Sequence, residues 1–262
     1  MTSWLGADSF AAPGGQLAMH FHLPKPLHGW RAFAGEVGVI VLGVLIALAA
    51  QQVVEDLSWR ERARQATDAL RVEIGDHYRE AAEFVVAAPC IDRQIDALSA
   101  AVAASSPTPA RLYGDQMEEQ FVVRAPSRPW SENQWNAIRE EGAASHLDKD
   151  LRAQLGNHYA QIAIMRENNR MADQLVYKLI VLSQPIPLDP ATRAHFSEEL
   201  QELRGRFDYM KLVGGQILAR VEQMGFAPPK SYLDERMANS GTLEFCRAHA
   251  LPLAKIEPQK AS

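Results

Sequence analysis

The hydrophobic pattern of the chain is dominated by one uninterrupted apolar run near its start. Residues 37–50, VGVIVLGVLIALAA, include no charged or amide side chain. This run is too short to cross the ~30 Å hydrocarbon core of a bilayer, whereas the wider window 32–54 would be about 34 Å long as a helix. Glu36, Gln51 and Gln52 then fall near the two interfaces, where long polar side chains can reach water. The pattern predicts a transmembrane helix over 32–54.

Two other uses of this run remain open from the residues alone. One is the buried core helix of a soluble domain, which can be equally apolar. The other is a cleavable signal peptide, since Ala47-Leu48-Ala49 fits the small-x-small cleavage pattern. A lead of about thirty residues is long for a signal peptide, and helix-forming sequence continues past Gln52. An uncleaved anchor is therefore favoured.

After the anchor, apolar residues recur at steps of three and four, which is the spacing of an amphipathic helix. They are Ala63, Ala66, Leu70, Ile74, Tyr78, Ala81, Val85 and Ala88. Pro89 is expected to end this helix because proline has no N–H to donate. Residues 90–104 are expected to form a second, shorter helix. The anchor and the first helix are predicted to form one rod of more than fifty residues.

Residues 105–131 lack a regular pattern and are predicted to form an irregular loop. Prolines recur in it, and residues 121–123, Phe-Val-Val, are compatible with a short strand. Trp130 and Trp135 are expected to pin the end of this loop to the core. Long loops in compact domains are commonly functional or disordered.

The next two helices are marked by capping residues. Ser131 is expected to cap a helix over 132–141, which Gly142 ends. A looser capping-box pattern, from Ser145 to Asp148, is expected to start the following helix. The apolar positions of that helix continue to residue 179.

A last long helix is expected to begin at Asp189 and Pro190, the preferred pairing at a helix start, and to end at Gly225. The remaining residues are punctuated by prolines, with one short helix expected near 242–250. No alternation of strands and helices occurs along the chain. The predicted fold class is therefore all-α, with a single N-terminal transmembrane helix that continues into a bundle of four or five helices.

This pattern divides the chain into four parts. They are an N-terminal lead, 1–31, the anchor, 32–54, a helical bundle domain, 55–226, and a C-terminal tail packed on or near the bundle, 227–262. The formal net charge of −5 belongs to residues 55–262, since Asp8 and Glu36 balance Lys25 and Arg31 before them. A weakly acidic domain with scattered charges offers no basic stripe for nucleic acid and no polybasic patch for a membrane surface.

Cys90 and Cys246 are too few for a disulfide scaffold and lack the spacing of zinc ligands. In an oxidising compartment a disulfide between them is the natural use, and it would tie the first helical hairpin to the C-terminal tail. The alternative is two unrelated buried thiols. The disulfide is favoured on the condition that the domain is extracytoplasmic.

No catalytic, cofactor-binding or metal-ligating residue is predicted. Glu73 and His77, with Glu80 a turn further on, have half the spacing of a metal site but are expected to be solvated. The three histidines of the lead, His20, His22 and His28, are expected to be solvated as well. The sequence has no His-Glu-x-x-His motif, no Gly-rich phosphate loop and no Gly-x-Ser-x-Gly elbow.

Two polar or small interruptions fall inside the predicted helices. Residues 168–170, Asn-Asn-Arg, interrupt an apolar face and are expected to face solvent, with a buried contact to a small ligand as the minor alternative. Gly214 and Gly215 are expected to permit close packing between helices.

One face of the anchor is a candidate contact surface. At 100° per residue, Glu36, Gly43 and Ala47 share a face, with Gln51 at its edge. Gly43 and Ala47 form a small-xxx-small pair, which lets membrane helices approach closely, and Gln51 could hydrogen-bond across them. Homo-oligomer contact through this face is one hypothesis. The other is that glycine and alanine are simply frequent in membrane helices.

Flanking charges leave the orientation of the anchor open. Lys25 and Arg31 precede it, whereas Arg60, Arg62 and Arg64 follow it. Residues 25–31, KPLHGWR, followed by 35–47, GEVGVIVLGVLIA, resemble the anchor of a family of uncharacterised bacterial single-pass membrane proteins. The resemblance covers roughly residues 23–64. It implies a short cytoplasmic N-terminus, an anchor in the inner membrane and a periplasmic helical domain, and it implies no functional residues.

Three classes of function follow as hypotheses. The first is a scaffold or accessory protein of the cell envelope, with the lipid bilayer and an unidentified protein as partners. The second is an extracytoplasmic ligand sensor that signals through a partner, because the short lead has no output domain. The third is an enzyme of unrecognised type, which is the least favoured. An enclosed pocket with convergent polar groups would favour sensing, and an exposed apolar patch would favour partner binding.

Overall fold

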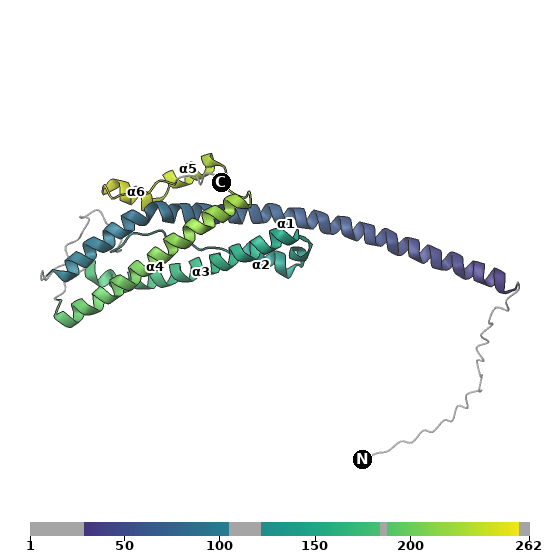
Figure 1. Ribbon diagram of the computed structural model, residues 1–262, viewed down its shortest axis with the longest axis horizontal. Helices are drawn as coiled ribbons and strands as arrows, with labels where there is room; N and C mark the ends of the chain where they lie inside the picture. The colour runs from purple at the N-terminus through teal and green to yellow at the C-terminus, as the bar shows by residue number, and fades with distance from the viewer. Residues whose placement is uncertain (1–28, 105–121, 184–187, 257–262) are drawn as a thin grey trace, which may run out of the picture. The chain divides into compact units, whose positions relative to one another are not determined.

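A computed structural model describes residues 29–104, 122–183 and 188–256, and all the regular elements in these ranges are helical (Figure 1). The α-helices are α1 (Trp30–Ala103), α2 (Asn133–Glu140), α3 (Lys149–Leu179), α4 (Pro190–Gln223), α5 (Lys230–Ala238) and α6 (Gly241–Ala248). Two short 3₁₀ helices, η1 (Ala143–His146) and η2 (Ile180–Ser183), flank α3. The predicted all-α class is confirmed. The chain divides into two compact units, Met1–Glu55 and Asp56–Ser262, and α1 contributes to both.

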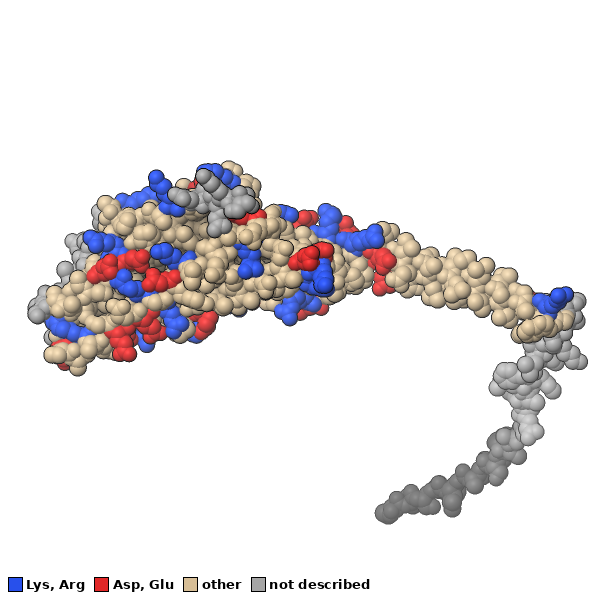
Figure 2. All heavy atoms as spheres, viewed as in Figure 1, with Lys and Arg blue, Asp and Glu red and all other residues tan. Residues whose placement is uncertain are grey.

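In the first unit, α1 exposes its apolar side chains. Val39, Leu42, Leu45 and Leu48 each keep more than half of their surface accessible. Within the described part of the chain, α1 is the one helix that is long and apolar enough to cross a membrane, and none of its most apolar stretch is buried. Figure 2 shows that stretch as almost entirely uncharged on the face drawn.

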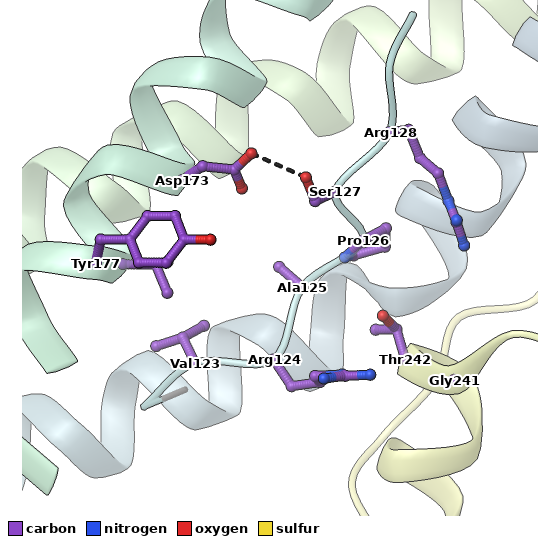
Figure 3. A pocket seen from close by; sticks show the side chains of 11 residues that line it. Val123, Arg124, Ala125, Pro126, Ser127, Arg128, Asp173, Tyr177, Gly241 and Thr242 are labelled. Atoms are coloured by element: carbon purple, nitrogen blue, oxygen red, sulfur yellow. Dashed lines mark hydrogen bonds between the residues drawn. The ribbon is translucent and has the colours of Figure 1, made fainter. Parts of the chain in front are cut away.

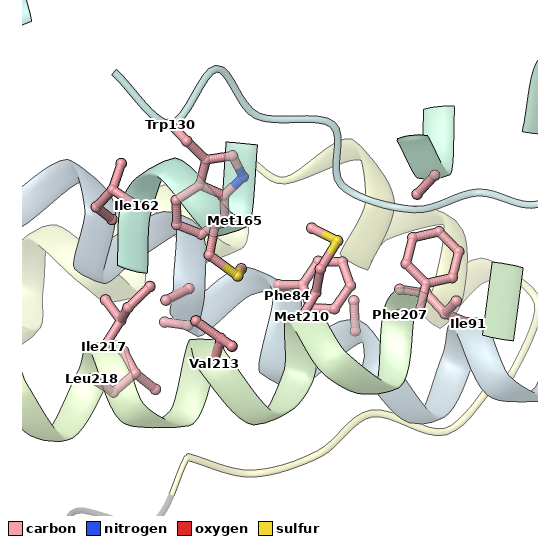
Figure 4. Packing of buried hydrophobic residues seen from close by; sticks show 14 of the residues in the cluster. Phe84, Ile91, Trp130, Ile162, Met165, Phe207, Met210, Val213, Ile217 and Leu218 are labelled. Carbon is pink, nitrogen blue, oxygen red and sulfur yellow. The ribbon is translucent and has the colours of Figure 1, made fainter. Parts of the chain in front are cut away.

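The core of the second unit lies between α3, α4 and the part of α1 that follows Asp56. Each of the three helices contributes a row of buried apolar side chains (Figure 4). They include Phe84 and Ile91 from α1, Ile162 and Met165 from α3, and Phe207, Met210 and Ile217 from α4. Complete burial of a side chain of this size contributes about 1.5–3 kcal/mol. The long helices therefore form because their apolar rows meet, as the three-and-four spacing predicts.

Polar contacts fix the direction of α4 against α1. The Tyr78 hydroxyl donates to Glu222 Oε1 at 2.8 Å, and Arg204 Nη2 lies 2.6 Å from Asp96 Oδ1. The earlier residue of α1 thus meets the later residue of α4, so the two helices run antiparallel. Gly214 lies between these contacts, where a Cβ atom would come within 3.3 Å of Val85 Cγ2. The close packing expected at Gly214 is confirmed, whereas a Cβ on Gly215 would meet open space.

The expectation that Pro89 ends a helix is wrong. Pro89 lies inside α1, which continues to Ala103, so no separate helix begins at residue 90. Proline deprives only one carbonyl of its helical partner and typically bends the helix instead of ending it. The ribbon of α1 bends where it passes α6 (Figure 1). Beside this bend, Ala254 N donates to Val86 O at 2.9 Å, which ties the C-terminal segment to α1.

Some of the predicted helix caps are confirmed and others are wrong. The N-cap residue of α2 is Glu132, not Ser131, although Ser131 Oγ accepts from Asn133 N at 3.3 Å. Asp189 caps α4 by accepting from Thr192 N, and Pro190 is its first residue, as expected. Gly142 and Gly225 adopt left-handed conformations, with φ of 79° and 68° respectively, after α2 and α4. The expected cap at Ser145 is wrong, because α3 begins at Lys149 and its cap is Asp148, which accepts from Asp150 N and Leu151 N.

The remaining differences concern short elements. The helix expected near 242–250 is present as α6, Gly241–Ala248, but α5 was not predicted. Val122 and Val123 lie in a bend and form no strand, and Phe121 lies outside the described residues, as does most of the predicted loop. The end of that loop is anchored as expected, since Trp130 and Trp135 are both buried.

Candidate functional site

The extended segment 123–130 is held against the bundle by side-chain amides. Gln94 of α1 accepts from Arg124 N at 2.7 Å and donates to Arg124 O at 3.0 Å, so its amide pairs with the backbone as a neighbouring strand would. Asn169 of α3 accepts from Arg128 N at 3.3 Å. At the end of the segment Trp130 has a φ of 48°, an uncommon value for a bulky residue. Burial of its indole ring offsets the cost of that backbone conformation.

A cavity of about 320 Å³ lies along this segment, and we refer to it as the α3–α6 cavity. Segment 123–128 lines it on one side, and the walls come from Asp173, Val176 and Tyr177 of α3 and from Gly241 and Thr242 of α6. Figure 3 shows the α3 residues on one side of the segment and the α6 residues on the other. Elements far apart in sequence therefore converge here with both charged and apolar side chains.

Asp173 supplies the negative charge of the α3 wall. Its Oδ2 accepts from Ser127 Oγ at 2.8 Å and from Asn169 Nδ2 at 2.9 Å. Burial raises the pKa of the Asp173 carboxyl, and the two hydrogen bonds act in the opposite direction. Both bonds reach the same oxygen, so Oδ1 has no hydrogen-bond partner among the described residues. Figure 3 shows the other carboxylate oxygen turned away from Ser127.

The α6 wall is the N-terminal turn of that helix. Ser240 caps the helix by accepting from Leu243 N at 3.2 Å, and its hydroxyl donates to Glu83 at 2.5 Å. The next residues, Gly241 and Thr242, line the cavity. Thr242 is only 6% exposed, and its hydroxyl has no hydrogen-bond partner among the described residues. The N-terminal turn of a helix carries partial positive charge, so this wall favours negatively charged groups.

Two arginines stand on the side of α6. Arg124 lies so close to Gly241 that a Cβ on this glycine would be 3.3 Å from Arg124 Nη2. Arg128 forms a two-point contact with Glu83, at 2.7 and 2.5 Å, and this hydrogen bonding raises the pKa of its guanidinium. Glu83 largely neutralises Arg128. The cavity thus has a carboxylate at its α3 wall and the partially positive end of a helix at its α6 wall.

A second feature is a buried polar row on α1, formed by Glu73, His77, Glu80 and Glu83. The expectation that Glu73, His77 and Glu80 are solvated is wrong, because all three are at most 7% exposed. Glu73 accepts from Tyr159 Oη at 2.7 Å and from Gln134 N at 2.9 Å, so it caps α2 from another helix. His77 Nε2 lies 2.7 Å from Ser131 O. The row therefore anchors α2 and the segment before it.

Glu80 is the least satisfied member of that row. Its Oε1 accepts from Arg79 at 3.2 Å, whereas Oε2 is buried without a partner among the described residues. Burial raises the pKa of the Glu80 carboxyl to about 7. Glu73, His77 and Glu80 also line a wider hollow of about 580 Å³ beside α1. No group of three metal-ligating side chains occurs in the described ranges.

The structure brings together one of the two residue sets singled out in the sequence. The Cys90 and Cys246 sulfur atoms lie at disulfide distance, 2.05 Å, and join α1 to α6. On the anchor, Glu36, Gly43, Ala47 and Gln51 all lie in α1 and are exposed, and nothing lies within 4 Å of a Cβ on Gly43. Homo-oligomer contact through that face stays a prediction. His20, His22 and His28 lie outside the described residues.

Sequence reasoning missed most residues of the cavity. Asn169 of the Asn-Asn-Arg interruption is buried, with contacts to Arg128 and Asp173, whereas Asn168 and Arg170 form hydrogen bonds near the surface. Asp173 and Thr242 had no distinguishing motif. A weak signal did exist for the α1 row, since Glu73, His77 and Glu80 continue the helical line of buried Phe84.

Comparisons of the chain with family models, with curated proteins and with solved structures find no match. The chemistry of the site therefore rests on its geometry alone. In the described residues, the α3–α6 cavity combines a carboxylate, an arginine, a threonine hydroxyl and a helix N-terminus. Such a set can bind and orient a small polar molecule.

Proposed function

We propose that this chain is a single-pass protein of the bacterial inner membrane whose periplasmic helical domain binds a protein partner, as a scaffold or accessory factor. The observation that carries the membrane part is the fully exposed apolar stretch of α1, which has no protein surface to cover it in the described structure. Two further points support the orientation. The anchor resembles that of single-pass proteins with an external domain, and a disulfide between Cys90 and Cys246 requires an oxidising compartment.

Partner binding is supported by an apolar row on the seam between α3 and α4. Gln161 Nε2 donates to Gln216 Oε1 at 3.0 Å, and Arg206 Nη1 lies 3.4 Å from Asn168 Oδ1. Between these two cross-links, α3 presents Ile164 and α4 presents Tyr209 and Leu212. Their exposed fractions are 40%, 43% and 59%. Exposed apolar groups that gather within a polar rim are typical of protein interaction surfaces.

The rim of this seam indicates the chemistry of the partner. Arg206 and Arg220 stand at its two ends, where Arg206 contacts Glu202 and Arg220 contacts Gln161. An amphipathic helix with an apolar face and acidic flanks would cover the apolar row and meet both guanidinium groups. The proposed partner is therefore an envelope protein that offers such a helix.

Site-specific photo-crosslinking in native membranes tests this proposal. A photoreactive amino acid is placed at Leu212 in the full chain, and a matched chain carries it at Glu235, an exposed residue of α5. A partner protein crosslinked from position 212 and absent from position 235 is the expected result. If only the chain itself is recovered from position 212, while a small molecule raises the melting temperature of the purified protein, partner binding is refuted.

The orientation has its own test. A reporter enzyme that is active only outside the cytoplasm is fused after Ser262, and a reporter that is active only in the cytoplasm is fused at the same position. Activity of the first fusion and inactivity of the second are expected. The reverse pattern would refute the periplasmic placement while leaving partner binding open to the crosslinking test.

Ligand sensing is the second candidate function, and the α3–α6 cavity is the observation that favours it. The cavity is partly open and brings polar groups together from three parts of the chain. A sensor built on this chain would transmit the signal through a partner protein. A crosslink at Leu212 that strengthens or weakens with ligand would support this function over a passive scaffold.

A further inference from the structure

We propose that the α3–α6 cavity binds a small zwitterion that carries an ammonium group and a carboxylate. The ammonium would contact Asp173, and the carboxylate would contact Thr242 and the N-terminal turn of α6. The inference deepens the second candidate function, and it holds whether or not a protein docks on the seam between α3 and α4.

The α3 wall is suited to a cation. Asp173 uses one oxygen for Ser127 and Asn169, which fixes the orientation of the carboxylate. The second oxygen has no hydrogen-bond partner among the described residues, and its half-buried position would strengthen a contact with an ammonium. A ligand that carried only negative charge would be repelled by this wall.

The α6 wall is suited to an anion. Thr242 is 6% exposed and lines the cavity, and its hydroxyl has no partner in the described chain, so it can donate to a bound carboxylate. Figure 3 shows the Thr242 oxygen directed toward Pro126, along the segment that lines the cavity. The N–H groups at the start of α6 add partial positive charge on the same side. A ligand that carried only positive charge would be repelled here.

Size and apolar lining limit the rest of the molecule. A volume of about 320 Å³ is at the lower end of small-molecule sites. Val123, Ala125 and Val176 also line the cavity and favour a short aliphatic body. An amino acid with few carbon atoms between its two charges meets these requirements.

A homologous series of ligands measures the spacing between the charges. Glycine, β-alanine and γ-aminobutyrate differ by one methylene each between the ammonium and the carboxylate. Propionate and propylamine serve as controls, because each carries only one of the charges. Binding of each compound to the full chain in detergent is measured by calorimetry and by the shift in melting temperature. We expect saturable binding that is strongest for one member of the series and at least ~10-fold weaker for both controls.

Variants assign the binding to the cavity. D173N removes the charge without changing the shape and should weaken binding of the best zwitterion at least ~10-fold, and T242V should weaken it ~3–10-fold. D208N, at an exposed position of α4, is the charge-matched control and should bind as the original chain does. D173E advances the carboxylate by one methylene and should shift the preference toward a shorter member of the series. A residue with a purely structural role would not cause that shift.

Three results would overturn the inference. They are the absence of saturable binding for all three zwitterions, binding of propionate or propylamine that equals that of the best zwitterion, and binding that D173N and D173E both leave unchanged. If D173N does not fold, the shift in preference with D173E decides the question. None of these results would alter the crosslink expected at Leu212, so the two proposals fail separately.

Discussion

The ring nitrogens Nδ1 of His77 and Nε2 of His158 lie 2.9 Å apart inside the bundle. His77 uses its other nitrogen, Nε2, to donate to Ser131 O, so in the neutral ring Nδ1 accepts from His158 Nε2–H. His158 Nδ1 is then an unprotonated nitrogen, buried without a partner among the described residues. Burial lowers the pKa of both rings and so favours their neutral forms, and the pair connects α1 to α3 and to the segment before α2.

Acid should weaken the fold through this pair. Burial lowers the pKa of His158 to about 3, and burial also lowers the pKa of His77. Below the ordinary value of 6.5 the unfolded chain binds protons that the folded rings do not, so stability is full above pH 6.5 and is lost as the pH falls toward 3. The free energy of unfolding should fall by up to ~1.4 kcal/mol per pH unit for each ring.

The variant H158Q isolates the contribution of His158. Chemical denaturation of the full chain in detergent, between pH 7 and pH 4, should show a smaller loss of stability in H158Q than in the original chain. H195Q, which replaces an exposed histidine of α4, is the matched control and should keep the original pH profile. Identical slopes for H158Q and the original chain would show that the buried pair does not control the acid sensitivity.

Glu80 should act in the opposite direction. Its folded pKa is about 7 and its ordinary value is 4.5, so the folded chain holds a proton that the unfolded chain has released between these pH values. The stability linked to this proton is present below pH 4.5 and is lost as the pH rises through 7. The variant E80Q avoids burial of a charge and should be more stable than the original chain at pH 8 by about 1–3 kcal/mol. At pH 5 the two should be nearly equal.

The control for Glu80 is E235Q, at an exposed position of α5. Its stability relative to the original chain should not change between pH 5 and pH 8. A loss of stability in E80Q at pH 8 would mean that the contact with Arg79 outweighs the cost of burying the charge, and the prediction would be wrong.

A larger side chain should be tolerated less well at Gly214 than at Gly215. A Cβ at Gly214 already approaches Val85 Cγ2 to 3.3 Å and the Ala81 carbonyl to 3.7 Å, whereas Gly215 faces open space. G214L should lower the free energy of unfolding by about 1–3 kcal/mol, because overpacking forces the helices apart. G215L should be neutral, or more stable by up to ~1 kcal/mol through helix propensity. Thermal unfolding of both variants checks this, and equal effects would contradict it.

The helices could be predicted because their signals are local. The spacing of Leu70, Ile74 and Tyr78 indicates a buried helix face even when the packing partner is unknown. Asp189 caps α4 because its side-chain oxygen accepts a hydrogen bond from the N–H of Thr192, three residues later. Pro89 shows the limit of local rules. The hydrogen bond lost at Pro89 costs free energy, but the tertiary packing of residues 90–103 stabilises the helix by more.

The cavity could not be predicted, because its residues meet only in the folded chain. Asp173 and Thr242 are separated in sequence by the whole of α4 and α5, and the register that places them on opposite walls depends on the packing of α3 and α6 against α1. The burial of His77 likewise depends on His158, which follows it by more than eighty residues. Charged residues at helical spacing are usually solvated, so the sequence favoured the wrong expectation.

The link between Cys90 and Cys246 should stabilise the folded chain. Their sulfur atoms lie at disulfide distance across a separation of 156 residues. Closing a loop of that length stabilises a chain by on the order of 5 kcal/mol in the entropic model, so C246S should unfold at a markedly lower temperature. The double variant C90S/C246S should unfold in the same way with and without reductant. Chain taken from intact cells and alkylated before lysis should run faster on a non-reducing gel than on a reducing one. Two free thiols in that chain would remove the chemical argument for a periplasmic domain and leave its orientation to the reporter fusions.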